Sequence, residues 1–156
     1  MNFRAATLDD APHIAALIMS HQPLLTINPD GRGAEQFFES ISEQAIRSYV
    51  SSERYSYIVA SNGQEMAGFI AIRDRSHLYH LFVATSYQGR GLGRQLWEQA
   101  RRQAASTGNV CDFTVNSSTN AVLIYARFGF RQVAPRTETH GVAFIPMRLG
   151  VAQDVA

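Results

Sequence analysis

The chain has 156 residues, of which 46% are hydrophobic, and its formal net charge is +1. This length predicts one domain with a sizeable core over residues 1–150, followed by a short tail at 151–156. The charge is too small for a nucleic-acid surface. The N-terminus does not have the layout of a secretory signal, no stretch approaches a membrane span, and the single cysteine, Cys111, excludes an internal disulfide. We therefore expect a cytoplasmic protein that binds neither nucleic acid nor membrane.

The N-terminal third is predicted to be mainly helical after one short strand. The strand is expected over residues 2–6, and periodic apolar residues indicate a helix that ends near Ser20. Residues 22–33 contain two prolines and two glycines, which is typical of a loop. A second helix is expected over 34–50, with its aromatic and aliphatic face packed in the core.

Three strands are predicted next, at Tyr55–Ser61, Glu65–Arg73 and 76–83. Asn62-Gly63 is a strong hairpin signal between the first two, and Asp74-Arg75 marks the next turn. Beyond the glycine-rich segment described below, the pattern predicts a strand over Val110–Val115 and a short helix over 118–128 that ends at Gly129. A final pair of strands is expected at 130–133 and 142–149, joined by a loop at 134–141.

The most informative stretch runs from His77 to Ala105. An apolar strand leads through a polar link into Gln88-Gly89-Arg90-Gly91-Leu92-Gly93, and a helix is predicted from Arg94. The first N–H groups of a helix have no acceptor within it, and together with the helix dipole they bind anions. Glycines let the backbone turn tightly and let a phosphate approach closely. The stretch therefore predicts a site where backbone amides, helped by Arg90 and Arg94, hold a pyrophosphate.

Two common nucleotide motifs fit this stretch less well. The phosphate loop of nucleoside triphosphatases needs Lys and then Ser or Thr after its last glycine, whereas Arg94 and Gln95 follow here. The dinucleotide fingerprint needs G-x-G-x-x-G directly after a strand, whereas Gly89 comes six residues after Val83 and the spacing is G-x-G-x-G. Asp112 lies about as far downstream of the glycines as the acidic residue of that fingerprint, but it begins the next strand. A dinucleotide-binding domain is therefore kept only as an alternative.

The motif Q-G-R-G-L-G resembles the acetyl-coenzyme A signature of the GCN5-related N-acetyltransferase (GNAT) family. Residues 81–87 are similar to that family's fourth strand and its link, and Asn116–Asn120, Tyr125 and Phe128-Gly129-Phe130 are similar to its second half. The resemblance covers nearly the whole chain. It implies an α/β fold of order β-α-α-β-β-β-α-β-α-β-β, with a central, mostly antiparallel mixed sheet that is splayed between strands 4 and 5.

The resemblance also implies acetyl-coenzyme A (acetyl-CoA) as co-substrate. The amides of 88–93 would hold its pyrophosphate, and the exposed edge of the fourth strand would pair with its pantetheine arm. The residues implied in cofactor binding are Leu81, Phe82, Val83, Gln88, Gly89, Arg90, Gly91, Leu92, Gly93, Arg94, Asn116 and Asn120. For the two asparagines, the alternatives are a turn residue and a residue in the first turn of a helix.

Three catalytic roles follow from the same resemblance. The N–H of Val83 would stabilise the oxyanion, and Tyr125 would donate a proton to the departing sulfur. His77 lies where some family members carry a glutamate base, and His80 is the second candidate base. Strand alternation predicts His77 on one face together with Tyr79, Leu81 and Val83, and His80 on the other.

Other residues are weaker candidates for chemistry. Glu65 and Glu53 are possible bases, but no motif supports them. Cys111 has no histidine beside it in the sequence, so a covalent cysteine mechanism is disfavoured. The scattered histidines and the lone cysteine give no metal-ligand spacing, so no metal is expected.

We therefore expect an N-acetyltransferase that transfers the acetyl group directly to a primary amine, in a small molecule. The alternatives are a protein or peptide amine as acceptor, or a non-catalytic acetyl-CoA-binding module. Residues 22–38 and 134–141 are expected to choose the acceptor, with Phe37 or Phe38 as a wall of its site and with Arg136 and His140 as possible partners of an anionic group. A homodimer is possible, because dimers are common in the family.

Overall fold

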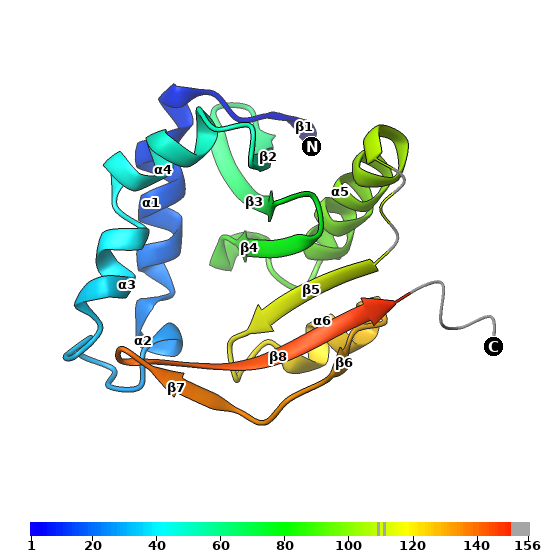
Figure 1. Ribbon diagram of the computed structural model, residues 1–156. Coiled ribbons are helices and arrows are strands. Elements are labelled where there is room, and N and C mark those ends of the chain that lie inside the picture. The colour runs from blue at the N-terminus through cyan, green and yellow to red at the C-terminus, as the bar shows by residue number, and fades with distance from the viewer. Residues whose placement is uncertain (109, 111, 151–156) are drawn as a thin grey trace.

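One curved sheet runs through the protein (Figure 1). The structure, a computed structural model, describes residues 1–108, 110 and 112–150, so Cys111 and the expected tail at 151–156 lie outside it. The strand order is β1-β2-β3-β4-β5-β8-β6, and β7 also pairs with β8. The strands are β1 (Asn2–Ala5), β2 (Tyr55–Asn62), β3 (Glu65–Arg73), β4 (His77–Val83), β5 (Asp112–Ser117), β6 (Arg131–Gln132), β7 (Thr137–Thr139) and β8 (Val142–Gly150). Among the described strands, only β4 and β5 pair in parallel, which confirms the expected mixed, mostly antiparallel sheet.

Helices cover both faces of the sheet. They are α1 (Ala11–Ser20), α2 (Gln22–Leu25), α3 (Glu35–Ser40), α4 (Glu43–Val50), α5 (Leu92–Gly108) and α6 (Val122–Phe128). Figure 1 shows α1, α3 and α4 on one side and α5 on the other. One core lies between α1, α4 and the sheet, around Ile14 and Phe69, and a second lies around Trp97 and Phe113. No described helix is long and apolar enough to cross a bilayer.

The helix expected over 34–50 is in fact two helices, because Ser42 interrupts it. Ser42 has an extended backbone (φ −64°, ψ 157°), and its hydroxyl accepts a hydrogen bond from the N–H of Ala45 at 3.1 Å. Serine is a preferred N-cap, so α4 begins anew after it. The expected loop at 22–33 also contains a short helix, α2.

The loop expected over 134–141 contains the strand β7, which pairs with β8 through a two-residue turn. His140 and Gly141 both have positive φ, at 48° and 82°, as a tight hairpin turn of this kind requires. The N–H of Ile27 donates to the carbonyl of Gly141 at 2.9 Å, and Thr26 bridges Val142. The two segments expected to choose an acceptor are therefore in contact with each other.

Strands β4 and β5 pair at only two positions and then diverge. The pairs are His77 with Thr114 and Leu78 with Val115, although β4 continues to Val83. The N–H of Ala84 donates to Ala67 on β3 at 2.8 Å. Backbone groups alternate along a strand, so those of Val83 point away from β3, towards the gap. The splay implied by the family resemblance is present.

A bulge in β4 overturns the predicted alternation of its side chains. His80 pairs with Ala71 and Leu78 with Ile72, so Tyr79 is an extra residue in the strand. Beyond it, Leu81 and Val83 pack towards α5, whereas Tyr79 packs towards α1 and α4. The His80 ring lies 4.0 Å from the Tyr79 ring between centroids, and it also contacts rings of that second side. The expectation that Tyr79 shares a face with Leu81 and Val83, opposite His80, is therefore wrong.

We predict that Gly141→Ala destabilises the fold by about 2–4 kcal/mol. A Cβ there would lie 2.4 Å from the carbonyl oxygen of Gly33, and φ is already +82°. The matched control is Gly63→Ala, which has φ +65° but open space around the new Cβ and should cost only about 1 kcal/mol of backbone strain. Urea unfolding measures both; equal losses would contradict the close approach at Gly141.

Candidate functional site

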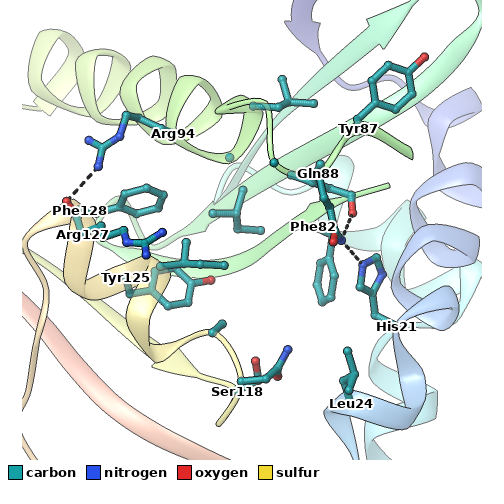
Figure 2. Close-up of a pocket in the computed structure, with 18 of the residues that line it drawn as sticks. His21, Leu24, Phe82, Tyr87, Gln88, Arg94, Ser118, Tyr125, Arg127 and Phe128 are labelled. Atoms are coloured by element: carbon teal, nitrogen blue, oxygen red, sulfur yellow. Dashed lines mark hydrogen bonds between the residues drawn. The ribbon is translucent and has the colours of Figure 1, made fainter. Parts of the chain in front are cut away.

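A cavity lies where β4 ends, between the N-terminus of α5, α6 and α2 (Figure 2). Its volume is about 570 Å³. Most of the residues expected to hold the cofactor line it, namely Leu81, Phe82, Val83, Gln88, Gly89, Gly91, Leu92, Gly93, Arg94 and Asn120. Arg90 and Asn116 do not line this cavity; Asn116 lines the neighbouring one.

The glycine-rich segment presents free backbone amides to this cavity. Gly89 and Gly91 have φ values of +77° and +78°, and nothing lies within 4 Å of a Cβ built on either. The N–H of Gln95 donates to Gly91 at 3.1 Å, and α5 begins at Leu92, slightly earlier than expected. The N–H groups of Leu92 to Arg94 therefore have no acceptor within the helix, and an anion can bind them.

Polar side chains frame the entrance to this cavity. Arg94 Nη2 donates to the carbonyl of Arg127 at 3.0 Å, and its guanidinium lies 5.3 Å from the centroid of the Phe128 ring. On the other side, Gln88 Nε2 donates to the Val83 carbonyl at 3.0 Å and lies 3.2 Å from His21 Nε2. Figure 2 shows these contacts as dashed lines on opposite sides of the cavity.

A second, smaller cavity adjoins the first. Its volume is about 290 Å³, and six residues line both cavities: Leu25, Leu81, Phe82, Ser118, Ala121 and Tyr125. Phe37 lines the second cavity, whereas Phe38 does not. Its far wall comes from β8, through Val142, Ala143 and Phe144. The two cavities thus adjoin each other at the gap between β4 and β5.

Tyr125 stands at the boundary of the two cavities. Its side chain is buried, with 6% of the residue exposed, and it comes from the middle of α6. Burial raises the pKa of the phenol, so it stays protonated at neutral pH. Figure 2 shows the ring and its hydroxyl pointing into the cavity. This position suits a hydrogen-bond donor for an atom that lies between the cavities.

Both candidate base histidines line the second cavity. His77 Nδ1 lies 2.8 Å from Thr114 Oγ1, and its pKa is lowered, first by burial and then by the charge of Arg73. His80 is half-buried, its Nδ1 is buried without a hydrogen-bond partner among the described residues, and desolvation lowers its pKa to about 3. Both rings are therefore neutral at pH 7. The bulge at Tyr79 brings the two histidines to the same cavity, which simple alternation did not predict.

The remaining candidates lie away from both cavities. Glu53 and Glu65 line neither, and no aspartate or glutamate among the described residues does. Arg136 forms an ion pair with Glu138 at 2.6 Å, and His140 occupies the β7–β8 turn. No group of three potential metal ligands was found among the described residues.

Sequence reasoning missed Arg73, which lines the second cavity. It pairs with His77 across the β3–β4 hairpin. The signal was available, because the predicted turn at Asp74-Arg75 already places the end of one strand opposite the start of the next.

We predict that the protein loses stability as the pH falls below 6.5, the ordinary pKa of histidine. His80 remains neutral in the folded state down to a pKa of about 3, whereas the unfolded chain binds the proton near 6.5. The difference amounts to about 2 kcal/mol between pH 7 and pH 5. His80→Phe, which keeps an aromatic ring beside Phe82, should reduce this dependence when urea unfolding is measured at both values of pH. An unchanged slope would mean that His80 is not buried as a neutral ring.

Comparison with known proteins agrees with this arrangement. A family profile described as Acetyltransferase (GNAT) domain matches residues 25–151. A search of curated proteins gave no significant match. Solved structures with the same fold include a GCN5-related N-acetyltransferase from Rhodopseudomonas palustris, with a TM-score of 0.78 and 22% identity over 96% of this chain and 95% of that one.

Of two further structures with this fold, one contains coenzyme A and the other is an enzyme named for its substrate. The PaiA N-acetyltransferase of Thermoplasma acidophilum, in complex with coenzyme A, has a TM-score of 0.71 and 16% identity, covering 96% of this chain and 98% of the other. A spermidine N-acetyltransferase from Vibrio cholerae has a TM-score of 0.68 and 15% identity, covering 96% and 94%. The profile matches most of the chain, which therefore belongs to the GNAT family of acetyltransferases, enzymes that use acetyl-CoA as co-substrate.

Proposed function

We propose that this enzyme transfers the acetyl group of acetyl-CoA directly to the primary amine of a small molecule. The observation that carries this proposal is the gap between β4 and β5, which joins a large cavity beside free helix amides to a small cavity with two neutral histidines. The segment at 22–33 contacts the β7–β8 turn, and residues from both sides of that contact line the small cavity. A cavity of about 290 Å³ favours a small acceptor over a protein surface.

In this proposal the first cavity holds the cofactor. The amides of 89–94 bind its pyrophosphate, since an anion at a helix N-terminus gains both hydrogen bonds and the dipole. The pantetheine arm lies in the gap, where the backbone groups of Val83 point. The side chain of Gln88 donates a hydrogen bond to the Val83 carbonyl, so the Gln88 side chain must turn away when the arm binds there. Asn120 lies beside the arm's path.

The proposed chemistry needs an oxyanion donor and a proton for the sulfur. The N–H of Val83 faces the gap and stabilises the oxyanion formed when the amine attacks the thioester carbonyl. Tyr125 donates a hydrogen bond to the leaving thiolate, because its raised pKa keeps the phenol protonated. Collapse of the tetrahedral intermediate then releases coenzyme A and the acetylated amine.

Of the two histidines, His77 is the stronger candidate for the base. Its pKa is lowered, yet its burial is incomplete, so it can accept a proton from the ammonium group of the acceptor. Thr114 holds the His77 ring through Nδ1, so Nε2 is the ring nitrogen that would accept the proton. His80 is a weaker base, because a pKa of about 3 opposes its protonation.

The function is tested by ligand binding followed by turnover. Calorimetric titration with acetyl-CoA, NAD and ATP should show binding of acetyl-CoA alone. A panel of small amines, read out by the release of free thiol, should then identify at least one acceptor. Binding of NAD instead would support a dinucleotide domain, and binding of acetyl-CoA without any turnover on the panel would support a non-catalytic module.

We predict that Tyr125→Phe lowers kcat about 10- to 100-fold and leaves the Kd for coenzyme A nearly unchanged, because only the donor to the sulfur is lost. The matched control is Tyr57→Phe, which removes a buried hydroxyl without a partner that lies outside both cavities. Unchanged kcat in the Tyr125 variant, with chemistry shown to limit the rate, would remove this residue from the mechanism.

We predict that kcat/KM falls as the pH drops through the lowered pKa of His77, because the protonated ring cannot act as a base. His77→Gln should lower kcat/KM about 100-fold and abolish this acidic limb of the profile. Thr114→Val removes the contact to Nδ1 and should give a smaller loss with the limb retained. A limb that survives in the glutamine variant would assign the titration to another group.

A further inference from the structure

We infer that the acceptor is an amine that also carries a carboxylate, bound by Arg73, and an apolar group, as in a free amino acid with an aliphatic or aromatic side chain. This inference rests on the proposed function and names the substrate class of its second cavity.

The wall of the second cavity is mostly apolar and carries positive charge. Arg73 is its only permanently charged residue among those described, and no carboxylate lines it. An acceptor with several ammonium groups would meet a like charge there and find no counter-ion. An acceptor with one carboxylate would instead neutralise the site.

The guanidinium of Arg73 has no hydrogen bond to any other described residue. Its Nε is buried without a partner, and the nearest carboxylate oxygen, Asp74 Oδ2, is 3.7 Å away. Both oxygens of Asp74 instead accept hydrogen bonds from Arg54, at 2.9 Å each. The Arg73 side chain is 33% exposed, so its terminal N–H groups remain open to a ligand, and a carboxylate can accept two of them at once. Arg54 thus engages the carboxylate of Asp74, which would otherwise compete with a ligand for Arg73.

The position of Arg73 fits the proposed chemistry. Its guanidinium lies 5.0 Å from the centroid of the Tyr79 ring, and it pairs directly with His77 across the hairpin. Its charge also contributes to the lowered pKa of both His77 and His80, so its field reaches the whole site. A carboxylate held by Arg73 would therefore leave a nearby amine within reach of His77.

The rest of the cavity suits a small apolar group. Phe37, Phe82 and Phe144 line it together with Tyr79, and its volume of about 290 Å³ is at the low end for ligand sites. Aromatic walls of this kind bury an aliphatic or aromatic side chain favourably. Size, charge and wall chemistry thus agree on one class of acceptor.

The substrate test compares phenylalanine with analogues in which the carboxylate is esterified or absent, beside leucine and a polyamine. Acetylation of phenylalanine and leucine is measured beside phenylalanine methyl ester, phenethylamine and spermidine, by release of free thiol from acetyl-CoA. We expect kcat/KM for at least one free amino acid to exceed that of the ester, the decarboxylated amine and the polyamine by at least 10-fold.

The variant test separates the carboxylate contact from general effects of charge. Arg73→Gln should raise KM for the amino acid about 10- to 100-fold, since a charged hydrogen bond is lost, and should leave phenethylamine nearly unaffected. Arg54→Gln frees Asp74 to pair with Arg73 and should change KM in the same direction. Arg75→Gln, two residues from Arg73 and outside the cavity, is the matched control and should have no effect.

Each outcome decides between the two proposals. Failure to bind acetyl-CoA contradicts the proposed function itself. Intact binding of acetyl-CoA with faster acetylation of phenethylamine or spermidine, with no acetylation of any amino acid, or with equal loss for all amines in Arg73→Gln, overturns the carboxylate inference alone. Circular dichroism of each variant confirms that a loss does not come from unfolding.

Discussion

The separation of β4 from β5 is the constraint on which the rest of the structure depends. The two strands pair through only two residue pairs. Beyond Leu78, the edge of β4 that faces β5 is not paired with another described strand. Backbone groups without partners are costly in a protein interior, so such an edge favours a ligand that can hydrogen-bond with it. The gap is confined to the ends of the two strands, because β3 and β5 both pack against α5 in one core, while α1 and α4 pack on the other face.

The same gap lies between the two cavities. Its upper part opens at the free amides of α5, and its inner part opens into the smaller cavity, with Tyr125 between the two. The hydrogen bond from Ile27 to Gly141 joins segments more than a hundred residues apart, and the nearby residues Leu25 and Val142 line the smaller cavity. The two cavities share residues of α2, β4 and α6, but β8 lines only the smaller one and the glycine-rich segment lines only the larger one.

The sequence predicted those features that depend on local chemistry. The glycines of 89–93, the hairpin at Asn62-Gly63 and the helix stop at Gly129 each reflect a backbone requirement, and the structure has all three. It did not predict the bulge at Tyr79, because an extra residue in a strand leaves no compositional signal there, and every face assigned beyond it was therefore reversed. The predicted turn at Asp74-Arg75 did place Arg73 opposite the start of β4, but it gave no sign that Arg54, twenty residues before Asp74, holds the Asp74 carboxylate.

The central claim is that backbone amides at the start of α5 hold the diphosphate of the thioester carrier. A crystal structure with coenzyme A tests it most directly. The account predicts diphosphate oxygens at about 2.7–3.2 Å from N–H groups of residues 89–94, with the pantetheine arm between β4 and β5. A diphosphate bound elsewhere, or an arm that leaves the gap empty, would contradict it.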